Sequence, residues 1–329
     1  MINAKKYALI DLHLHLDGSM SLECARSLAK KQGIALPDDD ELLSRLRVSE
    51  DCRDLNEYLE RFELPLSLLQ TAEAVSESVE RLCNELAQEG LIYAEIRFAP
   101  QLHLQKGLTQ EDVVIAAIDG LSHGKLSASL ILCCMRGTDN REANIETVRL
   151  TQKYLGKGVC AVDLAGAEAL FPNENFVDVI EYARSLSLPM TLHAGEALGA
   201  DSVSSAIELG ANRIGHGVRS IEDQKLLSIL AEKKIPLELC PTSNLNTRVF
   251  DELSEYPIRT FLNAGIVITV NTDNTSVSST SLANEYQKLA DTFSLTEDEL
   301  QALALNSAYA TFLCDSDKEK LVEKIKLKF

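Results

Sequence analysis

Three features that the sequence lacks exclude several classes of protein. No run of roughly 20 apolar residues is present, so no segment is expected to span a bilayer. The first apolar stretch is interrupted by Asp and His and does not have a signal-peptide pattern. The eight cysteines form no CxxC pair, and we expect all of them to be reduced and most to be buried. These absences favour a cytoplasmic globular protein.

Basic residues are also scarce relative to acidic ones. The 329 residues include 32 Lys and Arg against 50 Asp and Glu, which gives a net charge of -18. A surface of this sign repels nucleic acid and anionic membranes, and no basic track is visible that would overcome the repulsion. We therefore expect no nucleic-acid or membrane partner and favour a small, uncharged or cationic substrate.

What the chain does contain is a repeated alternation of apolar segments and amphipathic helices, without internal repeats or long linkers. Near-continuous apolar runs are typical of buried parallel strands. Eight alternations predict a single α/β domain over residues 1–329, a (β/α)8 TIM barrel. The segment at 212–217 is the weakest strand, and without it an open doubly wound sheet is the alternative. The eight predicted strands are 7–14, 91–98, 128–134, 158–165, 188–194, 212–217, 235–240 and 265–273.

The connection between the first two predicted strands is unusually long and predicts extra helices there. Apolar residues recur in it near helical spacing, although Pro65 is expected to split the helix. The stripe is explained either by core packing or by an apolar lid over a site, and the sequence leaves both open. Its members are Leu55, Leu59, Phe62, Leu66 and Leu69.

Polar side chains with catalytic potential lie where predicted strands end. His13 and His15 alternate along the first strand, so their imidazoles face the same side and can share one ion. His193, His216 and Asp273 lie at the ends of three later strands. A lone histidine is more often an ordinary core or surface residue, but barrel enzymes place their chemistry at the C-terminal strand ends, where all of these fall. Imidazole and carboxylate are ligands that zinc accepts.

Five motifs in order, HLHLDGS, DLAGAE, LHAGE, IGHG and NTDN, resemble those of the adenosine deaminase family of the amidohydrolase superfamily. The resemblance covers nearly the whole chain and includes YAEIRFAP and CPTSN. It implies one Zn²⁺ per chain, held by His13, His15, His193 and Asp273. It also implies a purine nucleoside as the small-molecule substrate.

The same resemblance implies a role for each remaining motif residue. His216 would orient the attacking water or take its proton, and Glu196 would protonate purine N1. Glu196 can do so only if its own pKa is raised. The resemblance also gives substrate contacts: the Gly166 N–H to purine N3, Asp17 to the ribose 5′-hydroxyl, Asn274 to N7, with His15 bordering the substrate. Many family members have Asp in place of Asn274, but an amide supplies the same kind of donor.

The implied reaction is hydrolytic deamination of adenosine and 2′-deoxyadenosine to the inosines, as in purine salvage. The alternatives are deamination of a related aminopurine (adenine or an aminofutalosine-type nucleoside) and, as a different class, a catalytically silent zinc-binding scaffold. AMP is disfavoured because no Lys or Arg cluster accompanies the motifs. A binuclear hydrolase is disfavoured because GVCAVDLAGAE offers no bridging lysine.

Several other residues receive structural interpretations. Glu95 and Arg97 are predicted to form an ion pair, and Ser243 is predicted to support the ligands. Asp17 could instead cap a helix starting near Ser21. His103 and His123 are predicted to lie on the surface, and Ser316 with Glu319 to form a capping box for a C-terminal amphipathic helix.

Overall fold

Eight strands form the centre of the protein, and nearly all of their residues are buried. The computed structural model describes residues 2–49 and 51–329. Every predicted strand is present, including the weakest one, which is β6. Most observed strands are shorter than their apolar runs, because pairing stops before the run ends. The strands are β1 (Leu9–His15), β2 (Leu91–Phe98), β3 (Ala128–Met135), β4 (Val159–Ala165), β5 (Thr191–Ala194), β6 (Arg213–His216), β7 (Leu237–Leu239) and β8 (Ile268–Val270).

The helices surround the strands, and many begin at a residue whose side chain satisfies a free backbone N–H. Ser21, Asp38, Thr71, Thr109 and Thr296 all cap helices in this way. The helices are α1 (Leu22–Gln32), α2 (Asp39–Leu46), α3 (Leu55–Leu59), α4 (Glu63–Leu68), α5 (Ala72–Gln88), α6 (Gln110–His123), α7 (Arg141–Tyr154), α8 (Val177–Ser185), α9 (Ala200–Glu208), α10 (Gln224–Lys233), α11 (Pro241–Asn246), α12 (Ile258–Asn263), α13 (Leu282–Phe293), α14 (Glu297–Ala310) and α15 (Asp315–Lys326).

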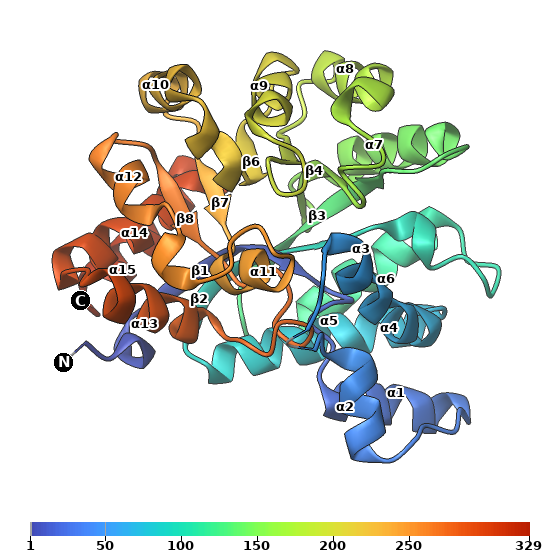
Figure 1. Ribbon diagram of the computed structural model, residues 1–329. Helices are drawn as coiled ribbons and strands as arrows, with labels where there is room; N and C mark the ends of the chain where they lie inside the picture. The colour runs from blue at the N-terminus through green and yellow to red at the C-terminus, as the bar shows by residue number, and fades with distance from the viewer. Residues whose placement is uncertain (1, 50) are drawn as a thin grey trace.

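Two half-sheets close into one barrel. Strands pair in parallel in the order β1-β2-β3-β4 and β5-β6-β7-β8. Parallel bridges join the halves at two seams, Val162 with Met190 and Leu14 with Asp273. At the second seam the Asp273 N–H donates to the His13 carbonyl at 2.8 Å. The strands lie inside a ring of helices (Figure 1), so the (β/α)8 prediction is confirmed and the open-sheet alternative is wrong.

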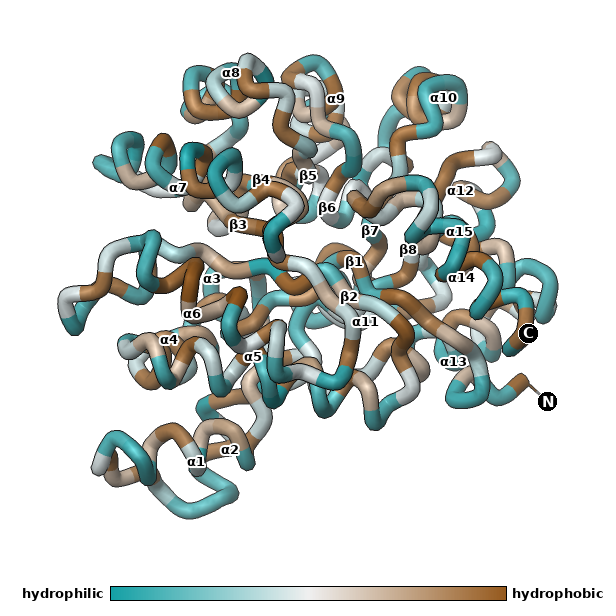
Figure 2. The backbone as a smooth tube through the Cα atoms, turned by 180° about the vertical axis from the view of Figure 1, so that it is seen from behind, coloured by the Kyte–Doolittle hydropathy of each residue, from teal (hydrophilic) through white to brown (hydrophobic). Residues whose placement is uncertain are grey.

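Hydropathy follows this layering. The strands are mostly apolar along their length, whereas the outer helices alternate between apolar and polar residues (Figure 2). On α5 the side chains of Val75, Val79 and Leu82 are buried, while the charged side chains between them, Glu77, Glu80 and Arg81, are partly exposed. The helices therefore bury one face against the barrel, as amphipathic helices do.

The long β1–β2 connection forms helices α1 to α5, as predicted. Here α1 and α2 project from the barrel, while α3 and α4 lie closer to it (Figure 1). The helix is interrupted at a 3-10 turn, Glu60–Phe62, and Pro65 lies in the first turn of α4. Proline is tolerated there because the first-turn N–H groups have no partner within the helix. The predicted split is thus present, just before Pro65.

At the C-terminus, α15 buries Leu321, Val322 and Ile325 against the body, so the amphipathic helix is confirmed. The predicted capping box is wrong. The helix begins two residues earlier than the box requires, and its N-cap is Cys314, whose side chain makes no capping bond.

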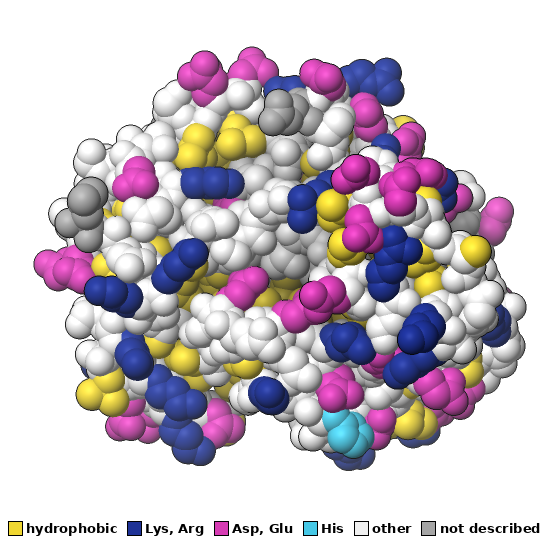
Figure 3. Space-filling model, turned by 90° about the horizontal axis from the view of Figure 1, so that it is seen from below, with side chains coloured by type: hydrophobic (Ala, Val, Ile, Leu, Met, Phe, Trp, Pro, Cys, Tyr) yellow, Lys and Arg dark blue, Asp and Glu magenta, His cyan; other side chains and the backbone are white. Residues whose placement is uncertain are grey.

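The surface agrees with the acidic composition. On the face in Figure 3, basic side chains are interspersed with acidic ones and form no continuous band. Among the described helices, none combines the length and the hydropathy required to cross a membrane.

Candidate active site

Four ligand-type side chains converge at the C-terminal end of the barrel. His13 and His15 come from β1, His193 comes from β5, and Asp273 lies just beyond β8. One ligand atom of each lies within 4.8 Å of the others. The Nε2 atoms of His15 and His193 are 3.3 Å apart, and Asp273 Oδ1 is 3.4 Å from the Nε2 of each β1 histidine. The strands end at one rim, which brings together residues far apart in the chain.

The donor set fits a divalent metal ion. His13 Nδ1 lies 2.8 Å from a Glu238 oxygen, and His193 Nδ1 lies 2.9 Å from an Asp163 oxygen. An imidazole that donates Nδ1–H to a carboxylate turns its Nε2 lone pair away, toward the centre of the cluster. His13 Nε2 is buried there without a hydrogen-bond partner. Three imidazole nitrogens and one carboxylate are typical ligands for zinc and for several other divalent metals.

Electrostatics favours the metal-binding protonation states of His15, His193 and Asp273. For His13, burial lowers the pKa, but the neighbouring Asp273 and Glu238 carboxylates outweigh burial and raise it. Burial lowers the pKa of His15 and of His193, so both imidazoles are neutral near pH 7. Burial alone would raise the pKa of Asp273, but the His13 imidazole, 3.4 Å away, outweighs it and lowers the pKa. The Ser243 hydroxyl also donates to Asp273 Oδ2 at 2.5 Å, as predicted for a supporting residue.

Glu196 and His216 lie beside this cluster. Glu196 follows β5 and His216 ends β6, and Glu196 Oε2 is 3.6 Å from His216 Nε2. Burial, followed by the negative charges of Asp273 and Glu168, raises the Glu196 pKa well above its usual value. A buried carboxyl in this environment holds its proton to a higher pH than an exposed one and can act as an acid.

The neighbours of His216 fix its tautomer. Tyr256 donates its hydroxyl to Asn244 Oδ1 at 3.0 Å, which turns the Asn244 amide nitrogen toward His216 Nδ1, 3.1 Å away. The proton of the neutral ring is then on Nε2. A Cβ on the preceding Gly215 would lie 3.1 Å from the His13 ring, so this glycine leaves room for the ligand. His216 therefore presents an N–H donor to the site.

These groups open onto a cavity of about 300 Å³. Asp17, Gly166 and Asn274 line it together with His15, Glu196 and the other site residues. Apolar residues of α3 and α4 line it too, so the predicted stripe forms one wall. Four of its five members do so, Leu55, Leu59, Phe62 and Leu66, whereas Leu69 is packed in the core. Every site residue expected from the sequence borders the cavity or the metal-ligand cluster within it.

Comparisons with known proteins agree with this geometry. The family model described as adenosine deaminase matches residues 8–328. The chain belongs to the adenosine deaminase family. A relative named adenosine deaminase from Haemophilus ducreyi is 49% identical, over 100% of this chain and 98% of its own. A second so named, from Enterococcus faecalis, is 42% identical over 96% and 95%. The crystal structure of an adenine deaminase from Arthrobacter aurescens superposes with a TM-score of 0.87 at 26% identity, covering 98% of each chain.

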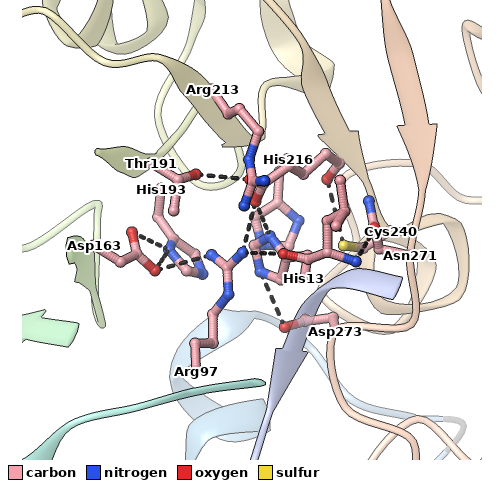
Figure 4. Close-up of polar contacts among 12 residues, drawn as sticks. His13, Arg97, Asp163, Thr191, His193, Arg213, His216, Cys240, Asn271 and Asp273 are labelled. Atoms are coloured by element: carbon pink, nitrogen blue, oxygen red, sulfur yellow. Dashed lines mark hydrogen bonds and ion pairs between the residues drawn. The ribbon is translucent and has the colours of Figure 1, made fainter. Parts of the chain in front are cut away.

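Beneath the ligands, this deaminase contains a buried ionic network (Figure 4). Arg97 donates to Asp163 at 2.9 Å and to Glu238 at 2.8 Å. The predicted Glu95–Arg97 pair is wrong, because Glu95 pairs with Arg213 at 2.7 Å. Residues i and i+2 of one strand point to the same side of the sheet and are roughly 6.6 Å apart. Glu95 and Arg97 therefore lie in different layers of the barrel interior, and each pairs with a residue from another strand.

Two further expectations are corrected. His103 is buried, not on the surface, and its Nδ1 lies 2.9 Å from the Leu69 carbonyl oxygen. His103 lies in the turn after β2, and the segment that follows α4 packs over its imidazole ring. His123 is exposed as predicted. The alternative in which Asp17 caps α1 is wrong, because the Ser21 hydroxyl accepts from the first turn.

Sequence reasoning missed several residues of this deaminase that contact the site residues. Asp163 and Glu238 orient the ligand histidines, Asn244 orients His216, and Glu168 binds the loop that carries Glu196. The sequence feature that could have identified them is a charged residue inside an apolar strand, such as Glu238 in LEL. A charged residue buried in this way needs a partner of opposite charge or a hydrogen bond.

Proposed function

We propose that this enzyme hydrolyses adenosine and 2′-deoxyadenosine to inosine and 2′-deoxyinosine, with release of ammonia, in purine salvage. Relatives at 49% and 42% identity over almost their full lengths carry the name adenosine deaminase. The observation that carries the chemistry is Glu196, a buried acid with a raised pKa that borders the same cavity as the metal-ligand cluster.

The reaction needs an acid on one side of the purine ring and a nucleophile at C6. Glu196 donates its proton to N1, which withdraws electrons from C6. Water adds to C6 and gives up both of its protons: one goes to the exocyclic nitrogen and the other restores Glu196. The bond from C6 to the exocyclic nitrogen then breaks, so that ammonia leaves, the oxygen stays on C6 and the proton from Glu196 stays on N1. His216, with its proton on Nε2, orients the water by donating a hydrogen bond.

We propose Zn²⁺, one per chain, as the metal held by His13, His15, His193 and Asp273. Bound there, zinc acts as a Lewis acid that lowers the pKa of water from 15.7 toward about 7. Elemental analysis of the purified enzyme should give about one zinc per chain, and His193→Ala should lose both metal and activity. Full activity without metal would contradict the assignment.

The substrate contacts are also proposals. The N–H of Gly166 would meet purine N3, Asn274 would donate to N7, and Asp17 would accept from the ribose 5′-hydroxyl beside His15. Gly166 suits this because its φ is 108°, which other residues rarely adopt. The apolar wall from α3 and α4 would cover the base.

The alternative functions can be distinguished by measuring deamination of different purines. One structural relative, at 26% identity, is named adenine deaminase. A carboxylate such as Asp17 at the cavity favours a nucleoside over free adenine, since the unfilled hydrogen bond would penalise an analogue lacking the hydroxyl. A silent zinc-binding scaffold would need neither Glu196 nor His216 in these positions. Rates on adenosine, 2′-deoxyadenosine, adenine and AMP would separate the candidates.

We further propose that the enzyme is a single domain over residues 1–329, that it works in the cytoplasm, and that it needs no nucleic-acid or membrane partner. One hydrophobic cluster containing residues from Ala4 to Ile325 supports the single domain. Eight free thiols support a reducing compartment.

The decisive experiment replaces the proposed proton donor. Glu196→Gln keeps the shape of the side chain but has no acidic proton, so kcat on adenosine should fall by about 10²–10⁴-fold while metal content is unchanged. The change in ultraviolet absorbance on loss of the amine measures the rate. Glu208→Gln, on the exposed face of α9, is the matched control. A kcat within a few-fold of wild type would mean that Glu196 is not the acid.

A further inference from the structure

A single buried carboxylate holds the loop that carries Glu196. Glu168 lies in the β4–α8 connection and is 1% exposed. Its Oε1 accepts from the Gly195 N–H at 2.7 Å and from the Ser202 hydroxyl at 2.5 Å. Its Oε2 accepts from the three following backbone N–H groups, those of Glu196, Ala197 and Leu198, at 3.1, 2.7 and 3.0 Å. Five donors, four of them consecutive along the backbone, therefore converge on one side chain.

The local backbone is shaped for this arrangement. Gly195 has a φ of 70°, and a Cβ there would lie 2.4 Å from a methyl carbon of Val203. Successive N–H groups that point to one side form an anion-binding concavity. Glu168 fills that concavity between β5 and the start of α9, so the position of this loop depends on the carboxylate.

Glu168 also connects two loops that would touch the same purine ring. It lies two residues after Gly166, the proposed contact to N3, and it binds the backbone of Glu196, the proposed donor to N1. Glu168 itself is not among the residues that line the cavity. Its effect on a substrate must therefore pass through these neighbours, and its negative charge also favours the protonated form of Glu196.

We propose that Glu168 is a positioning residue for the deamination step: by binding four consecutive N–H groups it fixes Glu196 relative to the Gly166 loop, so that the acid meets N1 of a ring held at N3. The inference rests on the proposed deamination of purine nucleosides. Misplacing a reacting group by about 1 Å lowers rates on the order of 10²-fold, which gives positioning its kinetic weight.

The test is a double-mutant cycle on the full-length, metal-loaded enzyme. Glu168→Gln keeps the volume, but its amide NH₂ cannot accept from the backbone donors it would face. We expect kcat on adenosine to fall at least tenfold, with KM within about threefold and metal content unchanged. Glu168→Asp, which keeps the charge, should recover part of the loss, and Glu208→Gln again serves as control.

The informative comparison is made in the Glu196→Gln background. If Glu168 acts through Glu196, adding Glu168→Gln there should lower kcat by less than twofold, because residues that act as a unit are strongly non-additive. An equal loss of kcat in both backgrounds would overturn the proposal, since a general disturbance of the fold predicts that result.

Two further results keep the interpretation clear. If Glu168→Gln does not fold, Ser202→Ala removes a single donor, and a loss of kcat should again appear only when Glu196 is present; an equal or absent effect in both backgrounds overturns the proposal. If wild type fails to deaminate any purine nucleoside, the proposed function is wrong. If wild type is active and the losses are additive, only the role of Glu168 is wrong.

Discussion

Replacing Arg97 should reveal how much of the stability depends on the ionic network beneath the ligands. Its guanidinium is fully buried and donates to Asp163, to Glu238 and to the Leu12 carbonyl. Arg97→Met keeps much of the length but leaves two buried carboxylates short of a cation. Removing one partner of a buried ion pair typically lowers the free energy of unfolding by about 3–5 kcal/mol.

The expected shift in melting temperature follows from the size of the protein. An unfolding entropy of about 2.1 cal/mol/K per residue gives roughly 0.7 kcal/mol/K for this chain, so Tm should fall by about 4–7 °C. Thermal unfolding followed by circular dichroism, with and without a chelator, separates the effect of the network from loss of metal. The exposed Arg149 on α7 provides the control, because Arg149→Met should change Tm by less than about 1 °C. Equal shifts for the two variants would refute the reasoning.

Three further predictions concern single side chains. Burial lowers the pKa of His103 to about 4, below the value of about 6.5 for an unfolded chain. The unfolded state therefore binds more protons, and the free energy of unfolding falls as the pH decreases from 6.5 to 4. His103→Asn should reduce this loss by about 2 kcal/mol in urea titrations at pH 6.5 and 4.5, and an unchanged difference would contradict it. A Cβ on Gly18 would lie 1.7 Å from Asn274 Oδ1, so Gly18→Ala should displace that amide. The variant should lose at least about tenfold in kcat/KM for adenosine, or about 1.4 kcal/mol. An unchanged kcat/KM in the variant would show that Asn274 does not contact the base. Asp17→Ala should shrink the preference for adenosine over 5′-deoxyadenosine, and an unchanged ratio of kcat/KM would mean that Asp17 does not read the 5′ position.

The sequence was sufficient to predict the barrel and the cluster of site residues. Buried parallel strands are continuous apolar runs, and their ends meet at one rim, so motifs such as those of His13, His193 and Asp273 could be expected to converge. The segment at 212–217 was also predicted correctly as a strand, although its pattern is the weakest of the eight. Its bounds, and those of β7 and β8, were too long because hydropathy does not record where pairing stops.

The partners of buried charges could not be predicted in the same way. Arg97 and Glu95 are neighbours in the sequence, yet each pairs with a residue from another strand, and only the three-dimensional register decides which. His103 appeared to be a surface residue because its cover comes from a separate segment near Leu69. Glu168 belonged to a recognised motif, but its five donors become visible only once the backbone of the next loop is known.

The seam between the first and last strands has a consequence for synthesis of the chain. Leu12 in β1 donates to the side chain of Asn271, 259 residues later, so β1 leaves the ribosome long before its last partner exists. At roughly 5–20 residues per second, that delay is about 13–50 seconds. During this time one edge of β1 has unpaired backbone groups, which makes it a template for pairing with other chains. Binding by a chaperone in this interval would protect the nascent protein from aggregation, and the finished barrel has no such edge.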